Sequence, residues 1–239
     1  VTFGGYGLNT YTPWGMQQVT GTPMIAAYFA DVDTRGGWVE PTPGGTSTGS
    51  DLVWYQFDNT GNGSLTVTWD DVGYYYSATN LLNAFQLRLI GTGNGNFDIE
   101  FRYEDINWTT GNASYGVGGL GGTVARAGFT AGDGLNFYEF WQSGSQADML
   151  ALESTPGNTG TNGYYYFSTS GASATQSVID GDGGNNLLTG SETGGQILRG
   201  YAGDDQLDGG GDEPGVVDQL FGGTGDDLYF CLLYTSDAA

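Results

Sequence analysis

Glycine and aspartate recur closely near the end of the chain, and these residues are the ones best suited to bind a ligand. The windows Gly200–Asp208 and Gly222–Phe230 both read G-x-x-G-x-D-x-U-x, where U is a large apolar residue. Aspartate supplies a charged oxygen, and glycine lets a loop turn tightly so that backbone carbonyls point inward. Calcium takes about six to eight oxygen ligands of these kinds. Acids clustered in glycine loops therefore favour cation binding over a merely soluble acidic surface.

The repeat can be followed through the chain by its apolar eighth position and its polar sixth position. The eighth position is filled by Leu188, Leu198, Leu207, Leu220 and Tyr229, and the sixth by Asn186, Gln196, Asp205, Asp218 and Asp227. Only the units containing Asp205 and Asp227 match the pattern fully. The stretch Asp212-Glu213-Pro214-Gly215 interrupts the array as a loop insertion. The apolar positions are expected on short strands, with their side chains inside a coil.

These nonapeptides resemble the calcium-binding repeats of the RTX proteins. The resemblance implies a short parallel β-roll, calcium bound between loops of alternate repeats, and type I secretion. Carried onto this chain, it pairs the Asp205 loop with the Asp227 loop, the Gln196 unit with Asp218, and the Asn186 unit with Asp205. The implied calcium ligands are Asp205, Asp227, Asp218, Asn186, Gly200, Ala202, Gly203, Gly222, Thr224 and Gly225.

Two alternatives to a working calcium array stay open. One is a flexible glycine–aspartate linker, and the other is a degenerate array that binds calcium weakly or not at all. If the array does bind calcium, the ion-free segment is expected to be disordered, because it holds repelling acids and few apolar residues. The binding energy would then become folding energy.

The composition excludes several classes of function. The chain has 239 residues, with 27 acidic residues, 5 basic residues, no histidine and a net charge of -22. Such a charge argues against nucleic-acid and anionic-lipid partners, which need cations. Without histidine there is no base for Ser-His-Asp or Cys-His catalysis, although paired carboxylates remain available for a glycosidase-like reaction. The single cysteine, Cys231, excludes a disulfide framework.

Short alternating strands separated by glycine-rich turns fill residues 1–169. Residues 97–103 place Phe97, Ile99 and Phe101 on one face and charged side chains on the other. The expected strands are Met24 to Ala30, Asp51 to Phe57, Leu65 to Trp69, Ala84 to Ile90, Phe97 to Tyr103, Thr123 to Phe129 and Gly163 to Ser168. This pattern predicts an all-β protein, with an antiparallel β-sandwich-like domain before the short parallel β-roll. A short helix is expected near residues 147–152.

A second resemblance covers about residues 23–167. The segments that carry it are Asp31-Val32-Asp33-Thr34-Arg35, Thr68-Trp69-Asp70-Asp71-Val72-Gly73, Asn83-Ala84-Phe85-Gln86-Leu87, Phe101-Arg102-Tyr103-Glu104-Asp105-Ile106-Asn107-Trp108 and Ala127-Gly128-Phe129. In this order they resemble the NIDO domain, an extracellular module. The resemblance implies cell–matrix adhesion and carries over no catalytic residue. The aromatic residues at its motif positions are expected in the core: Trp69, Phe85, Phe101, Tyr103 and Trp108.

Some residues of this first domain have two interpretations. Asp31 and Asp33 lie on the same side of a strand and would suit a cation, or they form a hydrogen-bonded turn or an ion pair with Arg35. The triplets 74–76 and 164–166 are all tyrosine, and their outward rings would either stack on sugars or pack within the sheet. A carbohydrate-binding module of a larger secreted enzyme is therefore the alternative function.

The sequence predicts four segments. They are an N-terminally truncated NIDO-like domain at 1–169, a linker at 170–180, calcium-binding repeats at 181–230, and a tail at 231–239. The tail resembles the translation of a sequencing adapter, and a natural final strand is the alternative. Together these segments predict a secreted, non-enzymatic bacterial fragment that binds calcium and a matrix or cell-surface protein or glycan.

Overall fold

The structure is a computed structural model that describes residues 1–4, 10–168, 178–190, 196–210 and 218–230. The chain divides into two compact units, residues 1–174 and 175–239. The predictions for the tail at 231–239 and for linker residues 170–177 lie outside the described residues. None of the described helices is long and apolar enough to cross a membrane.

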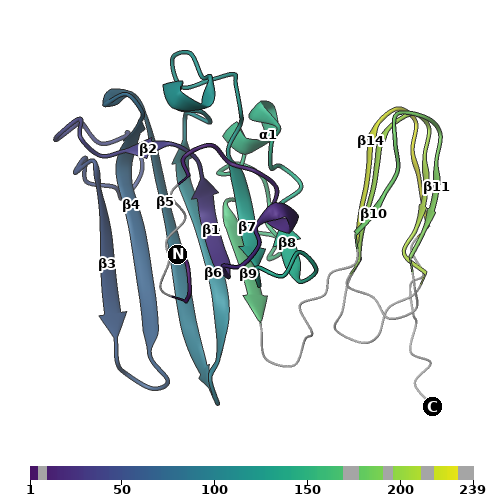
Figure 1. Cartoon of the computed structure of the whole chain (residues 1–239), viewed down its shortest axis with the longest axis horizontal. Coiled ribbons are helices and arrows are strands. Elements are labelled where there is room, and N and C mark those ends of the chain that lie inside the picture. Colours follow the sequence, from purple (N-terminus) through teal and green to yellow (C-terminus); the bar gives the residue numbers. More distant parts are fainter. Residues whose placement is uncertain (5–9, 169–177, 191–195, 211–217, 231–239) are drawn as a thin grey trace. The chain divides into compact units, whose positions relative to one another are not determined.

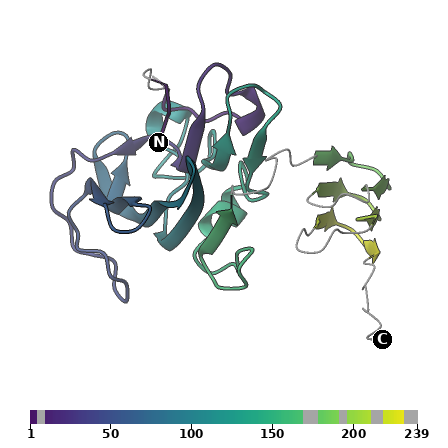
Figure 2. The ribbon, with the colours of Figure 1, turned by 90° about the horizontal axis from the view of Figure 1, so that it is seen from below.

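The first unit is an antiparallel β-sandwich with a larger and a smaller sheet (Figures 1 and 2). In its described residues the larger sheet has the order β2-β4-β5-β6-β9, with β3 also paired to β4, and the smaller sheet has the order β1-β7-β8. The strands are β1 (Met24–Phe29), β2 (Val32–Asp33), β3 (Leu52–Asp58), β4 (Ser64–Tyr74), β5 (Ala78–Gly93), β6 (Asn96–Ile106), β7 (Arg126–Thr130), β8 (Phe137–Glu139) and β9 (Tyr164–Ser168). The helical segments are η1 (Met16–Gln18), η2 (Asn112–Ser114) and α1 (Gln146–Leu150).

Aromatic side chains join the two sheets. The Tyr28 ring on β1 lies 5.4 Å from that of Phe85 on β5, and the Tyr138 ring on β8 lies 4.6 Å from that of Phe167 on β9. The Tyr103 hydroxyl on β6 donates a hydrogen bond to the Ala27 carbonyl on β1. A buried tyrosine needs a hydrogen-bond partner for its hydroxyl group. The smaller sheet is thereby fixed over β5, β6 and β9.

The expected core aromatics are mostly buried. Trp108 and Phe101 are fully buried, and Phe85 and Tyr103 are at most 5% exposed. Trp69 is only half-buried, although its ring stacks on that of Phe85 at 4.8 Å. Trp69 lies on β4, where the smaller sheet no longer covers the larger one (Figure 1).

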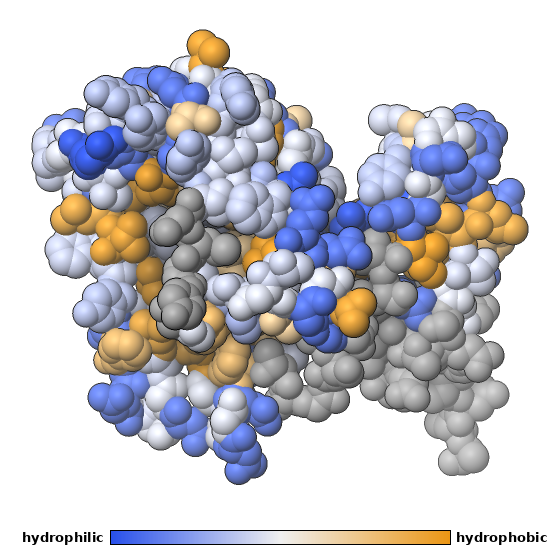
Figure 3. Space-filling view, in the orientation of Figure 1, coloured by the Kyte–Doolittle hydropathy of each residue, from blue (hydrophilic) through white to orange (hydrophobic). Residues whose placement is uncertain are grey.

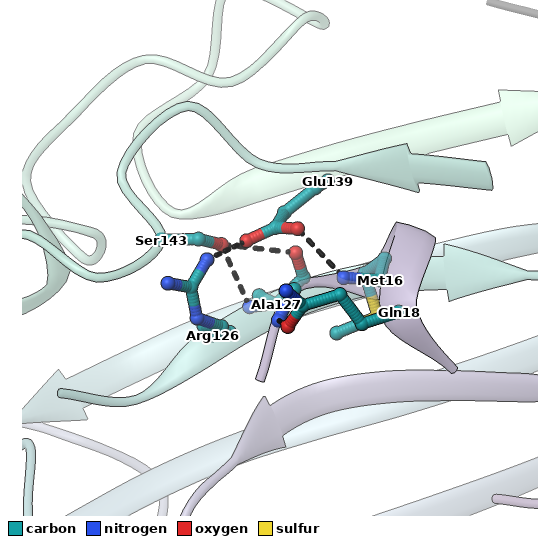
Figure 4. Close-up of polar contacts among 7 residues, drawn as sticks. Met16, Gln18, Arg126, Ala127, Glu139 and Ser143 are labelled. Atoms are coloured by element: carbon teal, nitrogen blue, oxygen red, sulfur yellow. Dashed lines mark hydrogen bonds and ion pairs between the residues drawn. The ribbon is translucent and has the colours of Figure 1, made fainter. Parts of the chain in front are cut away.

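The N-terminal segment is held on the smaller sheet by a partly buried ion pair (Figure 4). Arg126 on β7 pairs with Oε1 of Glu139 on β8, and Oε2 of Glu139 accepts the Met16 backbone N–H at 2.7 Å. Met16 itself is fully buried in a cluster with Val19, Met24 and other apolar residues. One carboxylate thus connects the sheet to the segment that precedes it.

Strand β3 extends the larger sheet beyond the cover of the smaller one. Every residue from Leu52 to Asp58 is exposed, and hydrophobic side chains gather over β3 and β4 in the space-filling view (Figure 3). In the ribbon, β1, β7 and β8 lie over β5, β6 and β9 (Figure 1). Strand β3 was expected at 51–57, but its lack of cover depends on where the smaller sheet ends.

The second unit is built from short parallel strands. The chain alternates between two described sheets, one with the order β10-β12-β14 and the other with the order β11-β13-β15. The strands are β10 (Val178–Asp180), β11 (Leu187–Thr189), β12 (Ile197–Ala202), β13 (Gln206–Asp208), β14 (Gln219–Thr224) and β15 (Leu228–Phe230). Paired strands are therefore alternate repeats, with Leu188 opposite Leu207 and Leu198 opposite Leu220.

The eighth positions of the repeats form the core of this unit. Leu188, Leu198 and Leu207 are buried together, and Leu220 and Ile179 pack against them. Tyr229 fills the same position on β15 but is 49% exposed. Strand β10, which carries Ile179, occupies residues 178–180. The sequence had assigned these three residues to the linker, but they form the first strand of the coil.

The sequence placed most strands of the first unit within a few residues. The short helix expected at 147–152 is α1 at Gln146–Leu150. Strands β2 and β8, of two and three residues, were not predicted. Segments this short carry too little alternation to be recognised.

Candidate functional site

The sixth-position side chains of the second unit stack along two edges of the coil. On one edge the Asn186 N–H donates to Oδ1 of Asp205 at 2.8 Å, and the Asp205 N–H donates to Oδ1 of Asp227 at 3.0 Å. On the other edge the Gln196 N–H donates to Oδ1 of Asp218 at 2.7 Å. The three pairs that the resemblance implied are therefore neighbours.

The first-position glycines make room for these carboxylates. A methyl group on Gly200 would lie 2.0 Å from Oδ2 of Asp205 and 2.6 Å from the Gly222 carbonyl oxygen. A methyl group on Gly222 would lie 2.0 Å from Oδ2 of Asp227. Since real side chains never approach this closely, any other residue at these positions would displace the carboxylate. Glycine is needed here for close approach of the chain.

Asp205 leaves one oxygen buried beside a backbone carbonyl. The residue is 1% exposed, and its Oδ2 has no hydrogen-bond partner among the described residues. This oxygen and the Gly222 carbonyl oxygen both lie within 2.6 Å of the position that a Cβ atom on Gly200 would take. A buried carboxylate oxygen that has no donor and lies near a carbonyl oxygen is unfavourable unless a cation lies beside it. The residues present therefore fit a hard cation such as calcium.

The remaining implied ligands lie in the stacked turns of the same edge. Ala202 pairs with Thr224, and the Gly203 N–H donates to the Thr224 carbonyl at 2.9 Å. A methyl group on Gly225 would meet the Gly203 carbonyl oxygen at 2.1 Å. The described residues contain no group of three or more acidic, histidine or cysteine side chains suited to a metal. Backbone carbonyls would therefore have to complete any calcium site.

In the first unit, the aspartate pair that follows β1 is divided between two roles. Nε and Nη2 of Arg35 donate to Asp33 at 2.7 and 2.5 Å, and these bonds lower the pKa of Asp33 to about 2. Asp31 is buried, and burial raises its pKa while Oδ2 has no partner within the described structure. Asp33 thus forms the expected ion pair with Arg35, and its Oδ1 also accepts the Arg35 backbone N–H at 3.1 Å, as in a hydrogen-bonded turn.

Two further carboxylates organise the loop at residues 46–50, which the sequence pattern did not indicate. Asp70 accepts hydrogen bonds from the side chains of Thr48 and Ser50, both at 2.5 Å. Glu104 accepts from the backbone and side chain of Thr46, both at 2.6 Å. The dense serine and threonine content of residues 46–50 was the available signal, but its partners lie on β4 and β6.

Three relatives from the comparison with known proteins each match part of this chain. The chain is 36% identical to human alpha-tectorin over 145 residues, which are 55% of this chain and 7% of that protein. It is 44% identical to chicken alpha-tectorin over 93 residues, 37% of this chain and 4% of that protein. It is 33% identical to nidogen of Drosophila melanogaster over 182 residues, 68% of this chain and 13% of that protein.

The chain thus spans only a small part of the length of these relatives. No solved structure matches it. The family described as "Nidogen-like domain" matches residues 2–171, which include every described element of the first unit. The segments 31–35, 68–73, 83–87 and 101–108, which carry the resemblance, all lie within this match. The chain therefore belongs to the nidogen-like domain family, NIDO.

Proposed function

We propose that this chain is part of a secreted adhesion protein in which calcium folds the second unit and thereby helps to display the NIDO domain. Family membership and the similarity to nidogen and alpha-tectorin support an extracellular, non-enzymatic role. Its partner would be a protein or glycan of the matrix or cell surface. The RTX-like repeats support secretion with the array unfolded and folding outside the cell.

The buried, unpartnered Oδ2 of Asp205 is the observation that carries the calcium part of the proposal. Calcium would neutralise this carboxylate and that of Asp227, with carbonyl oxygens of the turns at 200–203 and 222–225 as further ligands. Joining two successive coils in this way would offset the repulsion among the acids of the array. Extracellular modules bind calcium with dissociation constants of about 10⁻⁴–10⁻³ M.

Calcium titration of the full chain tests this mechanism. Far-ultraviolet circular dichroism is expected to gain β-structure with a midpoint in the range of about 0.1–1 mM, and magnesium is expected to act much more weakly. Asp205→Asn and Gly200→Ala are both expected to raise the midpoint, because one removes the charge and the other displaces the carboxylate. Gly183→Ala is the matched control, since a methyl group there meets no atom within 4 Å.

Two results would overturn the calcium mechanism. One is an unchanged spectrum at about 10 mM calcium, well above the affinities of such modules. The other is a Gly183→Ala midpoint that moves as far as that of Gly200→Ala.

Adhesion is tested separately by retention of the chain on an immobilised basement-membrane extract. Retention no greater than on albumin would contradict the adhesive role without affecting the calcium result.

A further inference from the structure

A groove of about 620 Å³ lies on the outer face of the larger sheet of the first unit. Its floor includes Trp54, Thr68, Gln86 and Arg102, and the loop at 46–48 lines it with Glu104. The volume falls within the usual range for pockets that hold small ligands. None of these residues contributes to the calcium mechanism.

The floor is one cross-strand row. Trp54 on β3 pairs with Thr68 on β4, Thr68 with Gln86 on β5, and Gln86 with Arg102 on β6. Arg102 pairs in turn with Tyr164 on β9. Directly paired residues of antiparallel strands project on the same side of the sheet. The row therefore presents an aromatic ring at one end and hydrogen-bonding groups in the middle.

The Trp54 ring lies at the edge of the groove and is held in place by a hydrogen bond. Its indole N–H donates to Oγ of Ser50 at 3.0 Å, and Ser50 Oγ donates to Oδ2 of Asp70 at 2.5 Å. The polar atom of the ring is thus already satisfied, yet the residue is 55% exposed. What remains in solvent is mainly the apolar ring, held in place by its neighbours.

The polar groups of the floor are also held in place. Nε2 of Gln86 donates to the Thr68 hydroxyl at 2.8 Å, and Nε of Arg102 donates to Oε1 of Glu100 at 2.5 Å. The guanidinium carbon of Arg102 lies 4.4 Å from the centre of the Tyr164 ring. The Arg102 side chain is nevertheless 54% exposed. Arg102 and the side-chain amide of Gln86 line the groove, so both can bind a polar ligand.

The charges at the groove favour a neutral ligand. Burial alone would raise the pKa values of Asp70 and Glu104, but the hydrogen bonds from residues 46–50 bring both below their usual values. Both side chains are therefore ionised at neutral pH and, with a net charge of -22, they repel anions. Their carboxylate oxygens already accept hydrogen bonds from the loop at residues 46–50. The two side chains therefore line the groove and are not expected to bind the ligand directly.

We propose that this groove binds a neutral glycan. The apolar C–H face of a sugar ring would stack on Trp54, and its hydroxyl groups would bond to Gln86 and Arg102. A pyranose offers both kinds of surface at once, which suits a fixed ring beside a row of donors and acceptors. The same row positions several polar groups along the sheet, so an oligosaccharide fits better than a single ring.

Titration with neutral tetrasaccharides tests this assignment. Maltotetraose, cellotetraose, mannotetraose and chitotetraose are added to the full chain up to about 10 mM, with calorimetry and tryptophan fluorescence as readouts. At least one sugar is expected to bind. Trp54→Ala is expected to weaken that binding by about tenfold or more, the equivalent of about 1.4 kcal/mol, and Gln86→Ala is expected to weaken it less.

Trp38→Ala is the matched control, because Trp38 is 68% exposed and does not line the groove. This variant is expected to bind the sugar like the parent chain. The assignment is wrong if none of the four sugars binds, if Trp38→Ala weakens binding as much as Trp54→Ala does, or if a neutral peptide competes the sugar from the groove. Unfolding curves of both variants separate loss of binding from loss of fold.

Discussion

At the scale of single residues, the environments of the carboxylates in the first unit shift their pKa values in different directions. Asp133 lies in an exposed turn, and backbone and side-chain hydrogen bonds from Asn136 lower its pKa to about 2. Burial raises the pKa of Asp105 to about 6, with added repulsion from Glu153, Glu104 and Asp71. The two shifts have opposite signs, so the two residues affect stability in opposite ways as the pH changes.

Asp105→Asn is expected to stabilise the chain at neutral pH and not in acid. Folding raises the pKa of this acid from its usual 3.8 to about 6, so the folded state holds a proton that the unfolded state has released. Stability is therefore lost as the pH rises through this window, and the full cost is present above it. Unfolding by urea at about pH 4 and pH 7.5 measures the difference.

Asp133→Asn is the opposite-sign control for this measurement. It is expected to destabilise the chain at neutral pH, with an effect that vanishes as the pH falls through about 2. If Asp105→Asn were equally stabilising at both pH values, a cause other than ionisation would be responsible.

At the scale of elements, the smaller sheet depends on contacts with segments outside it. Glu139 on β8 bonds to Arg126 on β7 and to the Met16 backbone, so it connects two strands with η1. Glu139 is 9% exposed. Removing it would leave the Met16 N–H and the Arg126 side chain without their acceptor.

Glu139→Ala is expected to destabilise the first unit by about 1.5–3 kcal/mol, the usual contribution of hydrogen bonds to charged groups. The Met16 amide is expected to exchange with deuterium much faster in this variant. Glu40→Ala is the control, because Glu40 is exposed and its change is expected to stay within about 0.5 kcal/mol. Equal losses in the two variants would show that the ion pair does not hold η1.

At the scale of the whole molecule, each unit has a core of its own. The first is filled with aromatic residues that join two antiparallel sheets, and the second with a column of leucines between parallel strands. All 6 tryptophans lie between Trp14 and Trp141, within the first unit. Tryptophan fluorescence therefore reports on the first unit alone.

Calcium removal is expected to leave the tryptophan-detected unfolding of the full chain unchanged. Far-ultraviolet circular dichroism is expected to show an additional transition that shifts to higher temperature with calcium, because a bound ion stabilises only the state that binds it. A chelator added to the calcium-loaded chain should abolish that shift. A tryptophan-detected midpoint that moves with calcium would contradict this division of roles.

The sequence alone determined the two architectures and the order of the units. Alternation over residues 97–103 specifies a strand, and leucines at nine-residue spacing, such as Leu198 and Leu207, specify a coil, because both patterns are local. The alternation does not predict that Asp98 and Glu100 on the charged face are buried as well. The repeat pattern also predicted that Asp205 lies next to Asp227, because equivalent positions of paired repeats lie side by side. The calcium itself stays a prediction.

Only the tertiary structure decided which residues meet across distance. The pairing of Trp54 with Thr68, Gln86 and Arg102 depends on the register of four strands, and the wall of the groove depends on a loop bonded to Asp70 and Glu104. The exposure of β3 depends on where the smaller sheet ends. Local patterns carry no information on such contacts, because register and sheet packing are fixed by the cooperative burial of many residues at once.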